Sequence, residues 1–408
     1  MVPRHKIDIS VADLLFALVS CLTARSPARA ERDALRALGI EEQGMVCLSV
    51  RSGLDLLLEA LSLPGGSEFV VSAVTHRDMA RILERHGIVP VPVDVDTATL
   101  EPRLDRLEGA LTGRTHAILV AHLYGGTVNL APIAAVARDR GLLLVEDCAQ
   151  SLGASPPGGD PLADVSMFSF GPIKTATALG GAVLRVSDPR LLDRMRALQA
   201  ARPSQKRSAY AARAARFLAL AALARPVVYG ALARVVDLDR LVAGSVRGFS
   251  GAGDELFEQL RLKPATPLVS VLRRRLRTFD RERIGARARA GEEMAALLSP
   301  RFARPGGSAA RRTHWVFPVV PPDPQALVAA LRRSGFDAAR GTTAIGVVTA
   351  PEGRPELEAL EARETMRDVV FLPVYPELNA GARRRLAETA NASLAEKETL
   401  ELRAHARS

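Results

Sequence analysis

The sequence predicts an α/β protein with a mostly parallel sheet of about seven strands and a smaller α/β domain near the C-terminus. Short apolar runs alternate with amphipathic stretches between residues 45 and 186, as they do in a sheet covered by helices. The run at residues 142–145 is apolar at every position, which is typical of a strand buried on both faces. Open sheets of this kind bind their ligands where the strands end.

The individual elements follow from the same patterns along the 408-residue chain. The strands of the large sheet are predicted at residues 45–50, 68–72, 88–93, 117–121, 142–145, 165–170 and 182–186. Helices are predicted at residues 54–63, 130–140, 209–224 and 268–275, and a long helix at 273–298 leads to the second domain. That domain contains predicted strands at 315–320 and 368–373, and helices at 324–334 and 378–389.

Three segments are expected from this order. Residues 1–44 form an N-terminal helical segment, residues 45–260 a large domain with a helical insert at about 190–260, and residues 261–408 a linking helix and a small domain. The apolar run near the N-terminus superficially resembles a signal peptide. Its apolar residues have helical spacing, and Asp8 and Asp13 argue against a signal peptide, so an amphipathic helix is favoured.

Two chemically active side chains follow neighbouring strands. Asp147 lies just beyond the apolar run 142–145, after Glu146, and Lys174 follows the next strand through a Gly-Pro turn. Lysine is rare in this arginine-rich chain: the lysines are Lys6, Lys174, Lys206, Lys263 and Lys397. Lys174 lies in an apolar, glycine-rich setting, which lowers the pKa of an amine and makes it nucleophilic. A carboxylate and such a lysine suit pyridoxal phosphate, which needs a Schiff-base lysine and an acid beside its pyridine nitrogen.

The motif Glu146-Asp147-Cys-Ala-Gln150, followed by Ser169-Phe-Gly-Pro-Ile-Lys174, resembles the DegT/DnrJ/EryC1/StrS family of sugar aminotransferases. The resemblance runs from about residue 46 to 186 and returns between 314 and 376. It implies a fold-type-I pyridoxal-phosphate enzyme in which Lys174 binds the cofactor and acts as base and acid. Asp147 would protonate the pyridine ring, Gln150 would bond near the ring hydroxyl, and Ser169 would bind phosphate.

Two further cofactor contacts are implied by position in the family pattern. A turn at Arg51-Ser52-Gly53 precedes a helix, and free N–H groups at a helix start bind anions. Ser52 and the Gly53 amide are therefore expected to bind the cofactor phosphate, with Arg51 adding charge; an ordinary helix cap is the alternative. His76 stands where the family has an aromatic ring stacked on the cofactor, and a surface or capping histidine is the alternative.

The chain departs from the family after residue 190. The loop motif that reaches into the partner subunit's active site is missing, and Ala/Arg-rich helical sequence takes its place. The segment 209–236 is read as an enlarged helical insert, with peripheral membrane or partner contact as an alternative. Lys263 or Arg261 would replace the missing loop and reach the partner's phosphate, unless both are solvated surface charges. His122 and Tyr124, in a His-Leu-Tyr-Gly turn, would order the pocket or simply pack at a strand end.

Composition agrees with a cytoplasmic enzyme. Three scattered cysteines fit a reducing compartment and lack metal-binding spacing, so no metal is expected. The net charge of +10 is spread along the chain, which suits anionic nucleotides and argues against a nucleic-acid-binding protein. The resemblance implies a homodimer with an amino-acid donor, glutamate or glutamine, and a nucleotide-linked keto-sugar acceptor in polysaccharide or secondary-metabolite biosynthesis. The alternatives are a sugar dehydratase with the same cofactor and a non-catalytic regulatory or scaffold protein on the same fold.

Overall fold

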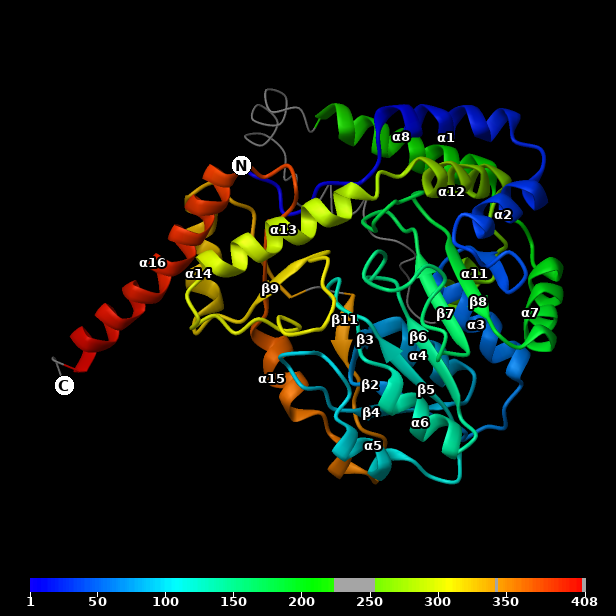
Figure 1. Ribbon diagram of the computed structural model, residues 1–408, viewed down its shortest axis with the longest axis horizontal. Coiled ribbons are helices and arrows are strands. Elements are labelled where there is room, and N and C mark those ends of the chain that lie inside the picture. The colour runs from blue at the N-terminus through cyan, green and yellow to red at the C-terminus, as the bar shows by residue number, and fades with distance from the viewer. Residues whose placement is uncertain (224–253, 342–343, 406–408) are drawn as a thin grey trace.

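A computed structural model describes residues 1–223, 254–341 and 344–405 of the chain, with side chains to residue 394. Its centre is a seven-stranded sheet in the order β1-β8-β7-β6-β5-β2-β4 (Figure 1). The strands are β1 (Gly44–Cys47), β2 (Glu68–Ser72), β4 (Val89–Val93), β5 (Thr115–Ala121), β6 (Leu143–Asp147), β7 (Val165–Ser169) and β8 (Ala182–Val186). The predicted α/β class, the mostly parallel sheet and its seven strands are confirmed.

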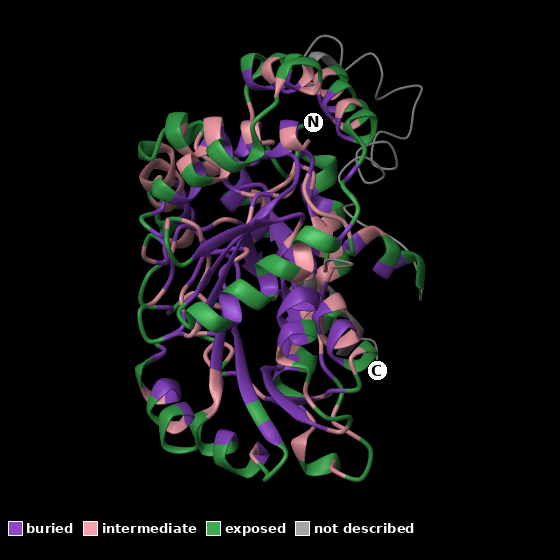
Figure 2. Cartoon of the chain, turned by 90° about the vertical axis from the view of Figure 1, so that its right-hand side faces the viewer, coloured by how far each residue is buried: buried purple, intermediate pink, exposed green. Residues whose placement is uncertain are grey.

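Only β8 breaks the parallel order, since it pairs antiparallel with both β1 and β7. The other neighbours pair in parallel, with Ala121 of β5 opposite Asp147 of β6. Their strands are buried almost throughout, as Figure 2 shows by their purple colour. Parallel pairing brings the carboxyl ends of β6 and β7 to one edge of the sheet, so Asp147 and the loop after β7 share that edge.

Helices cover both faces of the sheet. One apolar core joins the sheet to α3 (Val50–Leu61), α4 (Arg77–Arg85), α7 (Pro189–Ala201) and α11 (Asp254–Leu260). Two further cores lie under α5 (Leu104–Ala110) and α6 (Ala131–Asp139), and under the N-terminal helices. α3 begins earlier than the predicted helix at residue 54, because Ser49 caps it by accepting a hydrogen bond from the Ser52 N–H. This earlier start changes which backbone N–H groups remain unpaired in the first turn of α3.

The N-terminal segment is helical, as expected. α1 (Val11–Thr23) starts with a reciprocal capping box between Ser10 and Asp13, and α2 (Pro27–Arg36) follows. Both helices pack on α12 (Thr266–Thr278), and α1 also packs on α8 (Arg207–Leu223); these helices gather at one end of the molecule in Figure 1. Asp13 is buried and binds Arg274 and Arg275 of α12, so the acid that argued against a signal peptide joins two helices.

The predicted long helix 273–298 is wrong. The chain instead forms α12 and then α13 (Glu282–Leu297), with a break at Phe279, whose backbone is extended. α12 packs against the N-terminal helices, whereas α13 contributes Ala290 and Met294 to the core of the small domain. The break therefore separates the part of the linker that packs with the large domain from the part that packs with the small one.

The small domain holds a three-stranded antiparallel sheet of β9 (Phe317–Val319), β10 (Ala339–Arg340) and β12 (Val370–Leu372). It packs against α13, α14 (Pro324–Arg333) and α16 (Ala380–His405), and α16 runs well past the predicted end at residue 389. The other elements are a 3-10 turn (Pro355–Leu357), α15 (Leu360–Asp368) and a ribbon of β3 (Val74–His76) with β11 (Ile345–Val347). That ribbon joins C-terminal sequence to the start of α4.

The insert after β8 is helical where the structure describes it, in α7, α8 and α11; residues 224–236 of the segment 209–236 lie outside the described residues. No helix among the described residues is both long and apolar enough to span a bilayer. Arg261 and Lys263 do not point to a free anion site within this chain. Arg261 binds the buried carboxylate of Asp55 at 3.2 Å, and the Lys263 ammonium donates to the Ala200 carbonyl at 3.2 Å.

Candidate active site

Asp147 ends β6 with one carboxylate oxygen available. Its Oδ1 accepts a hydrogen bond of 2.9 Å from the Ala149 N–H, and its Oδ2 has no hydrogen-bond partner among the described residues. Burial raises the pKa of Asp147, although the Ala149 bond and the positive charge of Lys174 oppose this. The acid is thus nearly buried, next to a cation, and free to bind one more donor.

Lys174 lies in the loop after β7. Its N–H donates to the Gly171 carbonyl at 3.0 Å, and its ammonium nitrogen sits 4.2 Å from the centre of the Trp315 ring. Burial lowers the pKa of Lys174 to about 8; Asp147 opposes the shift and Arg51 adds to it. At pH 7.5 such an amine is neutral in about a quarter of the molecules, against about one in a thousand for an unperturbed lysine. The nucleophilic lysine predicted from the sequence has the environment that it needs.

The loop that carries Lys174 is held from the N-terminal segment. Asp8 accepts a hydrogen bond of 2.9 Å from the Ala176 N–H, and Ala176 has a positive φ of 55°. That backbone conformation is strained for alanine, so a fixed partner is needed to maintain it. Arg275 donates to the Asp8 carbonyl at 2.6 Å and so fixes the segment in turn. A residue far away in the sequence therefore sets the position of the lysine loop.

The predicted phosphate turn differs in detail from the expectation. Gly53 lies inside α3, and its N–H donates to the Ser49 carbonyl at 2.9 Å, so it is not a free anion donor in this structure. A side chain at this position would meet Leu184 at 2.7 Å, so close packing explains the glycine. The Ser52 N–H donates to Ser49 Oγ at 3.1 Å, and the two hydroxyls lie 2.9 Å apart. The start of α3 remains an N-terminus, but its free N–H groups come before Gly53.

Arg51 and His76 lie on the same side of Lys174. Arg51 forms an ion pair of 2.5 Å with Asp78, and both Arg51 and Lys174 carry charges that act on His76. The His76 Nδ1 accepts a hydrogen bond of 3.2 Å from the Asp78 N–H and caps α4, which is the capping role considered as an alternative. Burial and the Arg51 charge lower the pKa of His76 to about 4, so its ring is neutral at physiological pH. A neutral planar ring close to Lys174 can also stack on a ligand.

Gln150 and Ser169 support the site from the two sides of Asp147. Gln150 Oε1 accepts a hydrogen bond of 3.0 Å from the Tyr124 N–H, which holds a residue with φ of 58°. Ser169 Oγ accepts a weak bond of 3.4 Å from the Gly171 N–H, in the turn that leads to Lys174. Within the described structure both side chains thus shape local turns; their predicted contacts with a cofactor stay predictions.

His122 lies in a buried hydrogen-bonded cluster behind the site. Its Nδ1 accepts a bond of 3.0 Å from the Val128 N–H, so Nε2 carries the proton and donates to Glu146 at 2.8 Å. Cys148 lies close to both side chains, which gives three potential metal ligands within 4.8 Å of one another. The two imidazole nitrogens are already used, and burial raises the pKa of Cys148 well above its usual value. The cluster is therefore explained by hydrogen bonding, which holds the turn after β5; a role of His122 in ordering the pocket stays a prediction.

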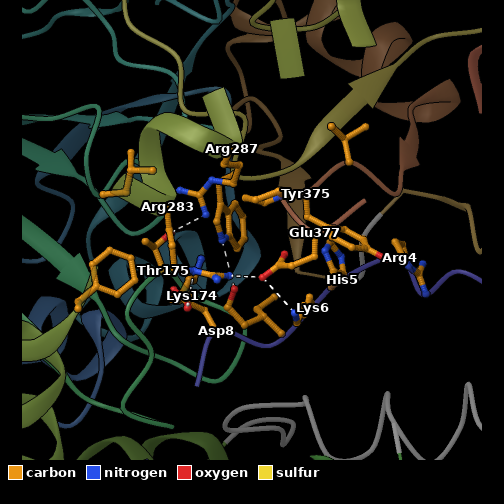
Figure 3. A pocket seen from close by; sticks show the side chains of 16 residues that line it. Arg4, His5, Lys6, Asp8, Lys174, Thr175, Arg283, Arg287, Tyr375 and Glu377 are labelled. Atoms are coloured by element: carbon orange, nitrogen blue, oxygen red, sulfur yellow. Dashed lines mark hydrogen bonds and ion pairs between the residues drawn. The ribbon is translucent and has the colours of Figure 1, made fainter. Parts of the chain in front are cut away.

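A pocket opens beside Lys174 that sequence analysis missed. It has an empty volume of about 590 Å³, including its open mouth. Figure 3 shows its side chains, which come from the N-terminal segment, the lysine loop, α13 and the segment after β12. Trp315 and Tyr375 both line it, and both lie within the second stretch that resembles the family, residues 314–376. No local pattern distinguishes its arginines Arg283 and Arg287 from the many others in the chain.

Together the described residues bring a desolvated amine, a buried acid, a neutral aromatic ring and a helix N-terminus to one edge of the sheet. This set matches the groups that pyridoxal phosphate needs: a nucleophile, a partner for its ring nitrogen, a face to stack on and an anion site. The free Oδ2 of Asp147 and the lowered pKa of Lys174 are the two features that fit most specifically.

The fold is that of solved aminotransferases. The aminotransferase TlmJ from Streptoalloteichus hindustanus superimposes with a TM-score of 0.69, covering 97% of this chain and 99% of its own at 21% identity. A putative sugar aminotransferase, Spr1654 from Streptococcus pneumoniae, superimposes with a TM-score of 0.70, covering 98% of this chain and 99% of its own at 16% identity. At these identities the likeness establishes the fold.

Sequence comparison identifies the family over about half of the chain. Residues 28–220 match the sequence model of the DegT/DnrJ/EryC1/StrS aminotransferase family, the family that its motifs predicted.

Curated relatives agree with this assignment. The erythromycin biosynthesis sensory transduction protein EryC1 of Saccharopolyspora erythraea is 41% identical over 161 residues, 38% of this chain and 43% of its own. GDP-perosamine synthase of Caulobacter vibrioides is 34% identical over 160 residues, 39% of this chain and 43% of its own. A dTDP-3-amino-3,4,6-trideoxy-alpha-D-glucose transaminase of Micromonospora megalomicea is 34% identical over 203 residues, 47% of this chain and 53% of its own. The matched part of this chain thus spans about half or less of the length of these relatives.

Proposed function

We propose that this protein is a pyridoxal-phosphate-dependent aminotransferase that transfers an amino group from an amino acid to a keto group of a nucleotide-linked sugar. The observation that carries the proposal is the pair of Lys174 and Asp147 at neighbouring strand ends. The lysine is desolvated, with a pKa of about 8, and the acid has an unused oxygen. Bound pyridoxal phosphate would supply an electron sink for the bond broken next to the amino nitrogen.

Each residue of the site has a distinct proposed role. Lys174 would hold the cofactor covalently and, once released, move a proton at the substrate carbon. Asp147 Oδ2 would hold a proton on the ring nitrogen, and the His76 ring would cover one face of the ring. The start of α3, with Ser52 and the charge of Arg51, would bind the phosphate, while Gly53 would serve through close packing. Gln150 and Ser169 are proposed to complete the contacts from the turns that they hold.

The substrate class rests on the relatives and on charge. Several relatives are named as enzymes of GDP-linked or dTDP-linked sugars, and the net charge of +10 favours anionic substrates. Glutamate or glutamine remains the proposed amino donor. A homodimer, a cytoplasmic location and the absence of nucleic-acid binding remain predictions. The three free cysteines, two of them buried, agree with a reducing compartment.

The visible absorption spectrum of the purified protein tests this proposal directly. After incubation with pyridoxal phosphate, we expect a protein-bound yellow band that disappears when L-glutamate is added and returns with 2-oxoglutarate. A band that forms but never responds to any amino acid would exclude the aminotransferase reaction. A protein that stays colourless would favour the scaffold alternative, in which the fold has lost its cofactor.

Substitutions of His76 separate its two proposed roles. His76→Asn keeps a capping acceptor but removes the ring, so we expect unchanged apoprotein stability and weaker cofactor binding. His76→Phe keeps a ring but removes the acceptor for the Asp78 N–H, so we expect cofactor affinity near wild type and a loss of about 1 kcal/mol in unfolding free energy. Urea unfolding and cofactor titration measure the two effects. Equal cofactor affinity in both variants would show that the ring does not stack.

A further inference from the structure

Arg287 of α13 is a partly buried arginine that forms no ion pair with a described residue. Its Nε donates to the Thr313 carbonyl at 3.0 Å, and its Nη1 donates to Thr175 Oγ1 at 3.0 Å. Its Nη2 is buried and has no hydrogen-bond partner. Neutral acceptors thus fix the orientation of the guanidinium but leave its Nη2 donors without a partner, which is costly for a buried polar atom.

The other arginines that line the same pocket, and Lys6, have acidic partners; Arg4 lies 3.5 Å from Asp337. Arg283 binds Glu377 at 2.6 Å and Asp8 at 3.5 Å, and the Lys6 ammonium lies 3.0 Å from Glu377. These contacts are the dashed lines around Glu377 in Figure 3. Two acids therefore form ion pairs with Arg283 and Lys6, while Arg287 forms no ion pair with a described residue and only the more distant charge of Asp8 favours its charged form. Burial lowers the pKa of Arg287 to about 10, so the guanidinium remains charged at neutral pH.

Arg287 is placed next to the reactive lysine. Its bond to Thr175 joins it to the residue that follows Lys174, and both side chains line the pocket together with Trp315 (Figure 3). The Trp315 indole N–H donates to the Ile173 carbonyl at 3.2 Å, so the ring forms a fixed wall beside the Lys174 ammonium. An anion bound at Arg287 Nη2 would therefore lie a short distance from the amine that moves the proton.

We propose that Arg287 binds a carboxylate group of the substrate and thereby orients the reacting carbon toward Lys174. This inference rests on the proposed function. A carboxylate is planar, bears a single charge and pairs well with a guanidinium whose orientation is already fixed. The group can be the α-carboxylate of the amino-acid donor, which is attached to the carbon that loses its proton, or an acidic substituent on the sugar acceptor.

The fluorescence of Trp315 provides a test that does not depend on turnover, because Trp315 is the only tryptophan in the chain. We expect L-glutamate to change its emission in the wild-type protein with a saturable dependence on concentration. Its α-amide, L-isoglutamine, should bind more weakly. Glucuronate, compared with glucose, probes an acidic sugar. A response to glutamate assigns the donor carboxylate to Arg287, and a response to glucuronate alone assigns the acceptor's acid. No response to either carboxylate would overturn the proposal.

Arg287→Met should raise the dissociation constant of the responding carboxylate about 10- to 100-fold, the effect of losing a charge-assisted hydrogen bond. It should leave isoglutamine or glucose binding unchanged. Arg287→Lys keeps the charge and should give an intermediate value. Arg283→Met is the matched control and should change the constant less than about threefold, because Asp8 and Glu377 already pair with Arg283.

Equal losses of the acid and its neutral analogue, or an equal loss in Arg283→Met, would overturn the assignment to Arg287. Circular dichroism shows whether Arg287→Met folds. If it does not, Arg287→Gln is used in its place with the same criteria, because glutamine keeps donors for Thr313 and Thr175. A wild-type protein that binds glutamate without ever transferring its amine would refute the proposed function and leave this inference standing. If the protein transfers the amine but glutamate binds equally well with and without Arg287, the proposed function would stand and this inference would be refuted.

Discussion

Replacement of Lys174 by alanine is expected to abolish amine transfer, with a loss of more than about 10³-fold in turnover. The variant loses both the covalent link to the cofactor and the group that moves the proton. It should nevertheless fold, because alanine removes an amine that burial already disfavours in its charged form. Single-turnover kinetics and thermal unfolding of the same preparation measure the two effects.

Lys206→Ala is the matched control for this variant, because Lys206 is exposed on the surface. It should retain the yellow band and turnover. Wild-type activity in Lys174→Ala would rule out Lys174 as the catalytic residue. A non-catalytic role for the protein would then be the better explanation.

The pH dependence of cofactor uptake provides a second measurement on Lys174. Only the neutral amine attacks the cofactor aldehyde. Since burial lowers the pKa to about 8, the rate should rise about tenfold per pH unit below 8 and level off above it. A rate that keeps rising toward the ordinary lysine pKa of about 10.4 would show that the amine is not desolvated.

Asp147→Asn should slow turnover by about 10²- to 10³-fold while leaving the yellow band in place. An amide has nearly the same shape as a carboxylate and can still accept the Ala149 N–H bond, so the strand end should keep its structure. It lacks the negative charge that holds a proton on the ring nitrogen. The expected signature is normal cofactor binding with slow bleaching by L-glutamate in stopped-flow absorbance.

Glu146→Gln tests whether that effect is specific to Asp147. Glu146 is the preceding residue of β6 and is also buried, but it binds His122 and the Asp160 N–H rather than facing Lys174. Its substitution should lower stability and change the bleaching rate far less than Asp147→Asn does. Equal slowing in the two variants would mean that the chemistry responds to general disturbance of β6.

The sequence was sufficient to predict the sheet and the placement of Asp147 and the Lys174 loop at one edge of it. The apolar run before Asp147 and the strand before Lys174 are local patterns, and parallel pairing necessarily brings their ends together. The predicted helix boundaries were less reliable than the predicted strands. α3 starts at a serine cap before Gly53, and the predicted long linking helix breaks at Phe279. Caps and breaks of this kind depend on single hydrogen bonds and on packing partners that are distant in the sequence.

Other features could not be read from the chain. Asp8 fixes the lysine loop from 168 residues away. Arg287 differs from Arg283, which lines the same pocket, because it forms no ion pair with a described residue and its Nη2 is buried without a hydrogen-bond partner. The sequence left open whether Arg261 reaches a partner's phosphate or is a solvated surface charge, and it did not predict the ion pair with the buried Asp55. In each case the role depends on which oppositely charged side chain folding brings nearby, and the local sequence does not encode that information.

α13 connects the proposed carboxylate site to the core of the small domain. Its C-terminal half packs in the small-domain core through Ala290 and Met294, and its N-terminal half carries Arg287 beside Lys174. Asp8 anchors the lysine loop to the large domain. If the small domain rotated about the break at Phe279, Arg287 would move with it and its distance from Lys174 would change. One ligand can contact both the guanidinium and the amine only while the two domains keep the arrangement seen in this structure. Binding of a carboxylate would therefore favour this arrangement.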